Sequence, residues 1–188
     1  MDERGEVITA TETTPGDVNV AHEMISLLES HHLNTGLKAD TVVADSKYGT
    51  IDNFLDCHDR GIEAHMPDLK ESAAKRIAGL SIFPEERFEY DRETDTYCCP
   101  AGQRLKPKSL HLYRQSRDYE APKKICAACQ LREQCTKNKT GRTLKRHLRQ
   151  DDIDKMQEAS RSAKAKRDIQ TRKHLMERSF AQSDTVWI

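Results

Sequence analysis

Two short apolar segments with a helical segment between them constrain the fold of this chain most. The segment TVVAD (41–45) is β-branched and almost free of polar residues, which is typical of a buried strand. The segment IEAHMP (62–67) predicts a further strand. Thr50 is a suitable N-cap for a helix between them that ends before Gly61. Two strands joined through a helix favour a parallel βαβ unit with a right-handed crossover.

The residues before this unit predict one more strand and one more helix. The segment GEVITATETT (5–14) alternates in the way of a strand. A helix is expected from a cap at Asp17 to about residue 30, with Gly36 as a stop signal. In open parallel sheets, functional groups gather beyond the carboxyl ends of the strands. Asp45 stands at such an end and is therefore a candidate functional residue, although a single aspartate there is also compatible with an ordinary turn.

Charge divides the chain into an acidic and a basic part. Residues 1–69 carry 14 acidic and four basic side chains, whereas residues 101–149 carry 14 basic and three acidic ones. Charge alone is equally compatible with a solvated surface, but a block this basic favours a polyanionic partner. No run approaches the roughly 18 apolar residues of a membrane span, and no signal-like N-terminus is present. We therefore expect a cytoplasmic protein without a membrane partner.

The change of composition along the chain predicts three segments. Residues 1–68 are expected to form an α/β core, residues 69–149 a basic cysteine-rich insert, and residues 150–188 a helical segment that completes the core. Within the insert, the sequence predicts a short helix over 70–80, hairpins over 83–106, and basic loops after them.

The last segment lacks glycine and proline over 151–180, which predicts one long helix. Its basic stretch KAKRDIQTRK (164–173) is expected to face solvent rather than the core.

Five of the six cysteines lie in the insert, as a CxxC (Cys126 and Cys129), Cys135, and the pair Cys98-Cys99. Four thiolates could close a tetrahedral structural zinc site of the zinc-ribbon kind. The ligands would be Cys99, Cys126, Cys129 and Cys135, with Cys98 as the alternative to Cys99. Free or redox thiols and disulfides stay open, although disulfides are disfavoured in a cytosolic chain and no thioredoxin-like strand precedes the CxxC. Bound zinc would fold an insert that has too little core of its own.

A second acidic candidate is Glu177, within RKHLMERSFA (172–181) and flanked by Arg172, Lys173 and Arg178. Ordinary pairing with Lys173 on the helix surface is the simpler interpretation. Phosphodiester cleavage and strand transfer offer another, because they can use two metal ions about 3.5–4 Å apart. Magnesium prefers oxygen ligands, and adjacent basic residues would hold the phosphate backbone.

Taken in order, these motifs resemble the DDE-type transposases of bacterial insertion sequences, in the group with a cysteine-bearing insert. The similar stretches are TETTPGDVNVAHEM, VVADSKYGTIDNF, YDRETDTYCCPAGQRL with CAACQLREQC, and RKHLMERSFA. They are spread over nearly the whole chain, which looks like the C-terminal part of such an enzyme. The resemblance implies a partial RNase H-like fold with a parallel or mixed sheet, and magnesium-dependent DNA cleavage and strand transfer. It also implies binding to transposon ends and target DNA at the nucleoid, and association as a homo-oligomer or with a full-length transposase.

The resemblance implies a role for each matching residue. Asp45 would be the second metal-binding aspartate and Glu177 the third acidic ligand. Lys47 and Tyr48 would support the site or contact DNA. The basic residues of the glutamate helix would contact phosphate; they are Arg172, Lys173 and Arg178.

The chain also departs from the family pattern. No residue before Asp45 fits the first aspartate, since Asp2 and Asp17 are poor substitutes. The lysine expected after Glu177 and the tyrosine expected before Arg172 are missing. These departures favour a truncated or frameshifted product without catalytic activity. A non-catalytic, zinc-stabilised nucleic-acid-binding protein is the alternative, and a basic module that joins or competes with a full-length transposase is a third hypothesis.

Overall fold

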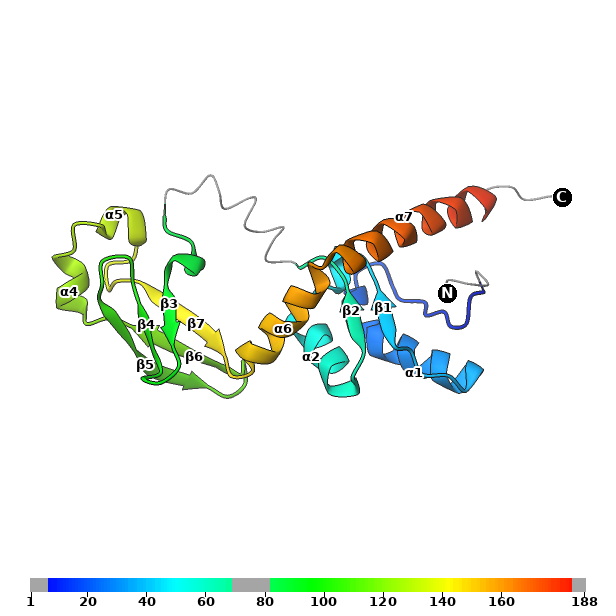
Figure 1. The fold of residues 1–188 in the computed structure, drawn as a ribbon, viewed down its shortest axis with the longest axis horizontal. Coiled ribbons are helices and arrows are strands. Elements are labelled where there is room, and N and C mark those ends of the chain that lie inside the picture. Colours follow the sequence, from blue (N-terminus) through cyan, green and yellow to red (C-terminus); the bar gives the residue numbers. More distant parts are fainter. Residues whose placement is uncertain (1–6, 69–81, 184–188) are drawn as a thin grey trace. The chain divides into compact units, whose positions relative to one another are not determined.

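A computed structural model describes residues 7–68 and 82–183, with the side chains of residues 178–183 left undescribed (Figure 1). The helix predicted over 70–80 lies outside the described residues. The chain divides into two compact units, one formed by Met1–Arg76 with Asp151–Ile188 and the other by Ile77–Gln150. No helix in the described parts of the chain has the length and apolar character needed to cross a bilayer.

The described part of the first unit begins with residues that form no regular secondary structure, and not with a strand. Residues 7–14 form no strand, so the prediction of one over 5–14 is wrong for the residues that the structure describes. Alternation alone does not make a strand, which needs a hydrogen-bonding neighbour. The 3₁₀ helix η1 (Val20–Glu23) is capped by the side chain of Asn19, which accepts from the backbone NH of Ala21 at 3.1 Å. Asp17 is therefore not the cap.

Helix α1 (Met24–Thr35) follows directly and runs about five residues beyond the predicted end, while Gly36 terminates it in the role predicted for it. Gly36 has φ +73°, and its NH donates to the carbonyl of His32. Glycine adopts this left-handed backbone conformation without the steric cost that a Cβ would impose.

The βαβ unit is confirmed. Strand β1 (Thr41–Val43) and strand β2 (Glu63–His65) pair in parallel, with helix α2 (Ile51–Arg60) between them. Thr50 caps α2 by accepting from the NH of Asn53 at 3.2 Å. Gly61 closes the helix with φ +68°. Both helix-boundary predictions therefore hold.

The core of the first unit lies between these strands and α2. Phe54, Cys57, Ala64 and Met66 are all at most 1% exposed, and Met24 of α1 joins them. Complete removal of Phe54 from water makes it one of the main stabilising residues, since Phe-to-Ala changes in cores cost about 3–5 kcal/mol.

The C-terminal segment forms two helices instead of the single one expected. Helix α6 (Gln150–Ser160) ends where the Ser160 hydroxyl bonds the carbonyl of Met66, and α7 (Ala163–Ser183) begins after Ser162. The Ser162 hydroxyl accepts from the NH of Ala165 at 3.1 Å, which is a capping contact. The break therefore uses side-chain capping in place of glycine or proline.

Helix α7 packs against β1 and β2, and Ala165 is fully buried there. The expectation that its basic stretch 164–173 faces only solvent is wrong. Basic residues flank the small buried Ala165, so one face of this stretch lies on the sheet.

The second unit is a five-stranded antiparallel sheet with strands in the order β3-β4-β5-β6-β7. The strands are β3 (Glu89–Asp91), β4 (Thr96–Cys98), β5 (Arg104–His111), β6 (Ser116–Glu120) and β7 (Thr143–His147). Short helices accompany them: η3 (Glu85–Arg87), α4 (Lys123–Ala127) and α5 (Arg132–Cys135). The predicted hairpins are confirmed, whereas the prediction of mere basic loops after them missed most of β5 and all of β6 and β7.

This unit has a small hydrophobic core of its own, and the expectation that zinc is needed to fold it stays a prediction. Buried in it are Phe88, Leu105, Tyr119, Ala121 and Leu144. Each of the strands β5, β6 and β7 holds only one fully buried residue, namely Leu105, Tyr119 and Leu144, among residues that are mostly polar or charged. The charged residues dominate the composition and hid the strand period in the sequence.

A polar cluster closes one side of this core around Asp95. The hydroxyls of Tyr90 and Tyr119 donate to Asp95 Oδ1 at 2.8 and 2.6 Å, and Arg117 donates to Oδ2 at 2.7 Å. Burial alone would raise the pKa of Asp95, but the bonds from Tyr119, Tyr90 and Arg117 outweigh it and lower that pKa. Asp95 has φ +48°, so the turn between β3 and β4 holds this carboxylate in a strained backbone position.

Candidate active site and cysteine cluster

Asp45 lies just beyond the carboxyl end of β1, where the sequence places it. The preceding residue, Ala44, is buried and donates its NH to the carbonyl of His65 at 3.1 Å, which continues the pairing with β2. Asp45 Oδ1 accepts from the NH of Lys47 at 2.8 Å and caps the 3₁₀ helix η2 (Ser46–Tyr48). One carboxylate oxygen is thus used by the local turn, while the side chain as a whole stays 46% exposed.

The second oxygen of Asp45 faces α7. Arg172 Nη2 lies 3.9 Å from Asp45 Oδ2, so the segment after β1 and helix α7 meet at this point. Tyr48 belongs to the same neighbourhood. Burial and then the Asp45 carboxylate raise the pKa of Tyr48, while Arg172 opposes them. Lys47 is exposed beside them.

Glu177 lies further along α7 and is 65% exposed, with its Oε1 4.0 Å from Lys173 Nζ. At 3.6 residues per turn, a residue five positions after Arg172 is rotated by about 140° around the helix axis. Arg172 is therefore the α7 residue directed at Asp45, and Glu177 occupies a different face. Arg178 has no described side chain.

The acidic residues do not assemble a magnesium site as they stand. Among residues 7–68 and the described part of 82–183, no group of three or more His, Cys, Asp or Glu side chains is placed to hold a metal ion. Asp45 instead has a guanidinium as its nearest charged neighbour across the sheet edge. Magnesium needs several oxygen ligands converging on one point, and the described residues bring no group of three such side chains together around Asp45.

Two contacts that the sequence analysis missed anchor α7 on β2. Lys164 bonds Glu63 at 2.6 Å, and Asp168 Oδ2 lies 2.7 Å from Nδ1 of His65. His65 is 2% exposed, so its ring is held inside the unit by this carboxylate.

With Arg172 on Asp45, these contacts form a polar ladder at residues 164, 168 and 172 of α7. The i, i+4, i+8 spacing was visible in the sequence, and it could have indicated one helix face with specific partners. Lys164 bonds and attracts Glu63 and so lowers the pKa of that carboxyl group. The ladder fixes which turn of α7 faces the end of β1.

Gly49 explains part of the motif around Asp45. A Cβ at this position would lie 2.1 Å from the backbone oxygen of Pro67. The backbone of the segment after η2 therefore approaches the segment after β2 more closely than any side chain allows.

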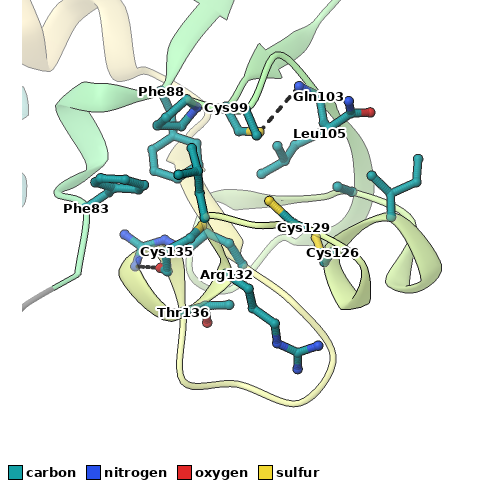
Figure 2. Close-up of a pocket in the computed structure, with 16 residues that line it drawn as sticks. Phe83, Phe88, Cys99, Gln103, Leu105, Cys126, Cys129, Arg132, Cys135 and Thr136 are labelled. Carbon is teal, nitrogen blue, oxygen red and sulfur yellow. Dashed lines mark hydrogen bonds between the residues drawn. The ribbon is translucent and has the colours of Figure 1, made fainter.

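In the second unit, the four cysteines predicted as zinc ligands line one small cavity of about 30 Å³ (Figure 2). They are Cys99, Cys126, Cys129 and Cys135, with Phe88 and Leu105 beside them. The NH of Gln103 donates to Cys99 Sγ at 3.4 Å. Cys98 Sγ instead bonds the carbonyl of Cys99 at 3.7 Å, and Cys98 is not part of the lining. The geometry therefore groups Cys99, and not Cys98, with the other three.

The backbone closes tightly on this cluster. Gly141 has φ +110°, and a Cβ there would lie 2.9 Å from Cys126 Sγ. Burial raises the pKa of Cys135, against the opposing charge of Arg142, and the other three thiols raise it further. All six cysteines are free thiols, and no three of the described ones are placed to hold a metal as they stand.

A family model described as Transposase DDE domain matches residues 98–185 of the chain. These residues are similar to a transposase DDE domain. The resemblance to DDE-type transposases is therefore confirmed, over a stretch that includes the cysteine cluster, Arg172, Lys173 and Glu177. Asp45 lies before the matched residues. Comparison with curated proteins and with solved structures gave no match.

Proposed function

We propose that this chain belongs to the DNA-processing machinery of an insertion sequence, with Asp45 and Glu177 as the second and third acidic residues of an RNase H-like active site. The observation that carries the proposal is the contact between Asp45 and Arg172. It joins the end of β1 to the helix of the transposase DDE domain that holds Glu177. The reaction of such a site is cleavage and strand transfer at transposon ends, for which bound magnesium supplies Lewis-acid and nucleophile-generating chemistry.

The chain alone is proposed to be inactive. The described residues supply too few carboxylates around Asp45 for a metal pair, and no acidic residue earlier in the sequence fits the first aspartate. What its own residues can do is bind DNA. Lys47, Arg172 and Lys173 carry the charge for phosphate contacts beside the acidic residues, and we assign Arg178 the same role from the family pattern.

Binding to a DNA duplex at increasing salt tests the DNA-contact part of this proposal. Arg172→Ala and Lys173→Ala should each weaken binding and reduce the slope of log K against log[salt] by about one unit. Lys38→Ala, which removes a lysine outside the proposed site, is the matched control and should leave the slope almost unchanged. Binding that does not depend on salt, or equal effects of all three changes, would contradict phosphate contacts at this site.

Incubation of the same duplex with the chain and Mg²⁺ tests the proposed inactivity. We expect no strand breaks above the background of the Asp45→Asn variant. Cleavage that Asp45→Asn abolishes would overturn the inactivity while supporting the catalytic role of Asp45.

The alternative function, a non-catalytic nucleic-acid-binding protein stabilised by zinc, is favoured by the convergence of four cysteines on one cavity. We propose that small side-chain rotations bring Cys99, Cys126, Cys129 and Cys135 onto one structural zinc ion. The chemistry of the donor set fits, because four thiolates suit tetrahedral zinc and a backbone NH already donates to Cys99 Sγ. Such an ion would serve the second unit in an active transposase as well.

Metal analysis of the purified protein decides the zinc proposal. We expect one zinc per chain, lost in Cys99→Ser and retained in Cys98→Ser, which changes the neighbouring thiol outside the cavity. Absence of zinc, or equal losses in the two variants, would contradict the site. The zinc-stabilised binding protein replaces the transposase assignment only if zinc is present and Asp45 and Glu177 share no metal.

A further inference from the structure

The hairpin between β5 and β6 carries the most exposed aromatic residue described in the chain. The Tyr113 ring has no protein cover at all, with a relative exposure of 101%, and its neighbour Leu112 is 73% exposed. Leu110 on β5 and Leu148 after β7 are each 50% exposed. Strand registry places them near the same end of the sheet, since His111 pairs with Ser116 and Ser116 with His147. A cluster of exposed apolar side chains at one end of a sheet marks an interaction surface.

This tip is held in a defined conformation. Gln115 adopts φ +44°, and its NH donates to the carbonyl of Leu112 at 3.1 Å. The NH of Leu148 donates to the carbonyl of Gln115 at 2.8 Å, so the segment after β7 supports the turn from the side. A supported turn presents Tyr113 outward instead of letting it fold back onto the sheet.

Charge identifies the kind of partner. Arg114 follows the tyrosine directly and is exposed, and the surrounding residues 101–149 carry 14 basic and three acidic side chains. An apolar protein surface would not require such an excess of positive charge, whereas a polyanion would. Nucleic acid combines this charge with the flat aromatic surface of an unstacked base, on which tyrosine stacks regardless of base identity.

We propose that Tyr113 stacks on an unpaired base of bound DNA, with Arg114 on the adjoining phosphate and Leu112 against the edge of the base. The inference rests on the proposed function only in taking DNA as the partner. It assigns the hairpin tip to opened or distorted DNA, and not to the regular duplex.

The test compares two DNA probes, a duplex with a short unpaired thymine bulge and the same duplex fully paired. Tyr113→Ala should weaken binding to the bulged probe by about tenfold or more, the range that single base–aromatic stacks reach. Binding to the paired probe should change less than about twofold. Tyr113→Phe keeps the ring and should bind the bulged probe as the unaltered chain does. Leu33→Ala, which truncates another exposed apolar side chain on α1, is the control for general effects.

Equal weakening on both probes, or no weakening on the bulged one, would overturn the stacking role. Loss of self-association in Tyr113→Ala, without an effect on the bulged probe, would assign the tip to a second copy of the chain and overturn it as well. Neither result decides whether Arg172 and Lys173 contact phosphate. That proposal is tested independently, by the salt dependence of binding to the paired duplex.

Discussion

Gly49 carries a steric demand that no other residue type can meet. Its added Cβ would collide with the Pro67 backbone oxygen, so Gly49→Ala must push apart the segments that follow β1 and β2. We expect the free energy of unfolding to fall by about 1–3 kcal/mol, the usual cost of overpacking. Chemical denaturation measures it. Gly16→Ala is the matched control, because nothing lies within 4 Å of its Cβ. Equal stability of the two variants would contradict the close approach at Gly49.

Asp95 makes the stability of the second unit dependent on acid. Its hydrogen bonds with Tyr119, Tyr90 and Arg117 lower its pKa, so the charged form is favoured in the folded state. The resulting stabilisation is fully present above the ordinary aspartate pKa of about 3.9 and is lost as pH falls through the lower folded value.

Asp95→Asn tests this linkage while tolerating the left-handed backbone position. We expect the variant to be less stable at pH 7 by about 1 kcal/mol, a modest figure because the Asp95 side chain is about one third exposed. Thermal unfolding at pH 7 and at pH 3 should show the difference shrinking with acid. If the difference in stability between the unaltered chain and Asp95→Asn were the same at both pH values, the charge of Asp95 would not contribute to the stability.

At the residue scale, the sequence predicted those boundaries that depend on local chemistry. Thr50, Gly36 and Gly61 act as predicted because capping and left-handed backbone are decided within a few residues. The cap at Asn19 in place of Asp17 depends on where the first helix starts, which Asn53 influences from α2. Its side-chain amide donates to the carbonyl of Ala21 at 3.0 Å. That distant contact could not be read from the sequence.

At the element scale, α7 is positioned by its polar ladder more than by apolar burial. Ala165 is small, and Lys164, Asp168 and Arg172 each meet a charged or ionisable partner on or near β1 and β2. Only the His65 side of this ladder is buried, and a polar contact to a buried group costs desolvation but can select one register of a helix. This contact could not be predicted from the sequence, because a basic composition says nothing about a partner strand.

Asp168→Asn tests the ladder at its contact with the buried His65. The amide keeps the size of the side chain but loses the charge next to His65, whose ring is almost fully enclosed. We expect a loss of about 1–3 kcal/mol in the free energy of unfolding. The substitution should also increase the rate of amide hydrogen exchange more along α7 than along α2. Glu158→Gln on α6, an exposed position, is the control. Unchanged exchange along α7 would contradict the anchoring role.

At the scale of the whole molecule, the acidic and basic parts of the sequence correspond largely to different units. The βαβ pattern was predictable because its strands are short, apolar and bounded by turn residues. The sheet of the second unit was not predictable from the sequence, because its strands are rich in charged residues. Each of β5, β6 and β7 has a single buried residue, namely Leu105, Tyr119 and Leu144. Grouping of the four cysteines followed from their spacing, but the preference for Cys99 over Cys98 needed the fold.

In the candidate active site too, some features could be predicted from the sequence and others depend on the fold. Asp45 could be placed from the pattern, and Arg172 could be named from the family resemblance. The orientation of Glu177 depends on how α7 is docked, and that is decided by His65 and Glu63, which lie more than a hundred residues earlier in the sequence.

We propose that Asp45 and Glu177 come to share one metal ion when the ion binds, although in the structure Arg172 faces Asp45 and Glu177 lies on a different face of α7. Paramagnetic broadening of backbone amide NMR signals by Mn²⁺ tests it most directly, since the ion replaces magnesium on oxygen ligands. We expect the signals around Asp45 and around Glu177 to broaden together during the titration, and Asp45→Asn to remove both effects. Broadening at only one of the two positions, or an unchanged pattern in Asp45→Asn, would contradict it.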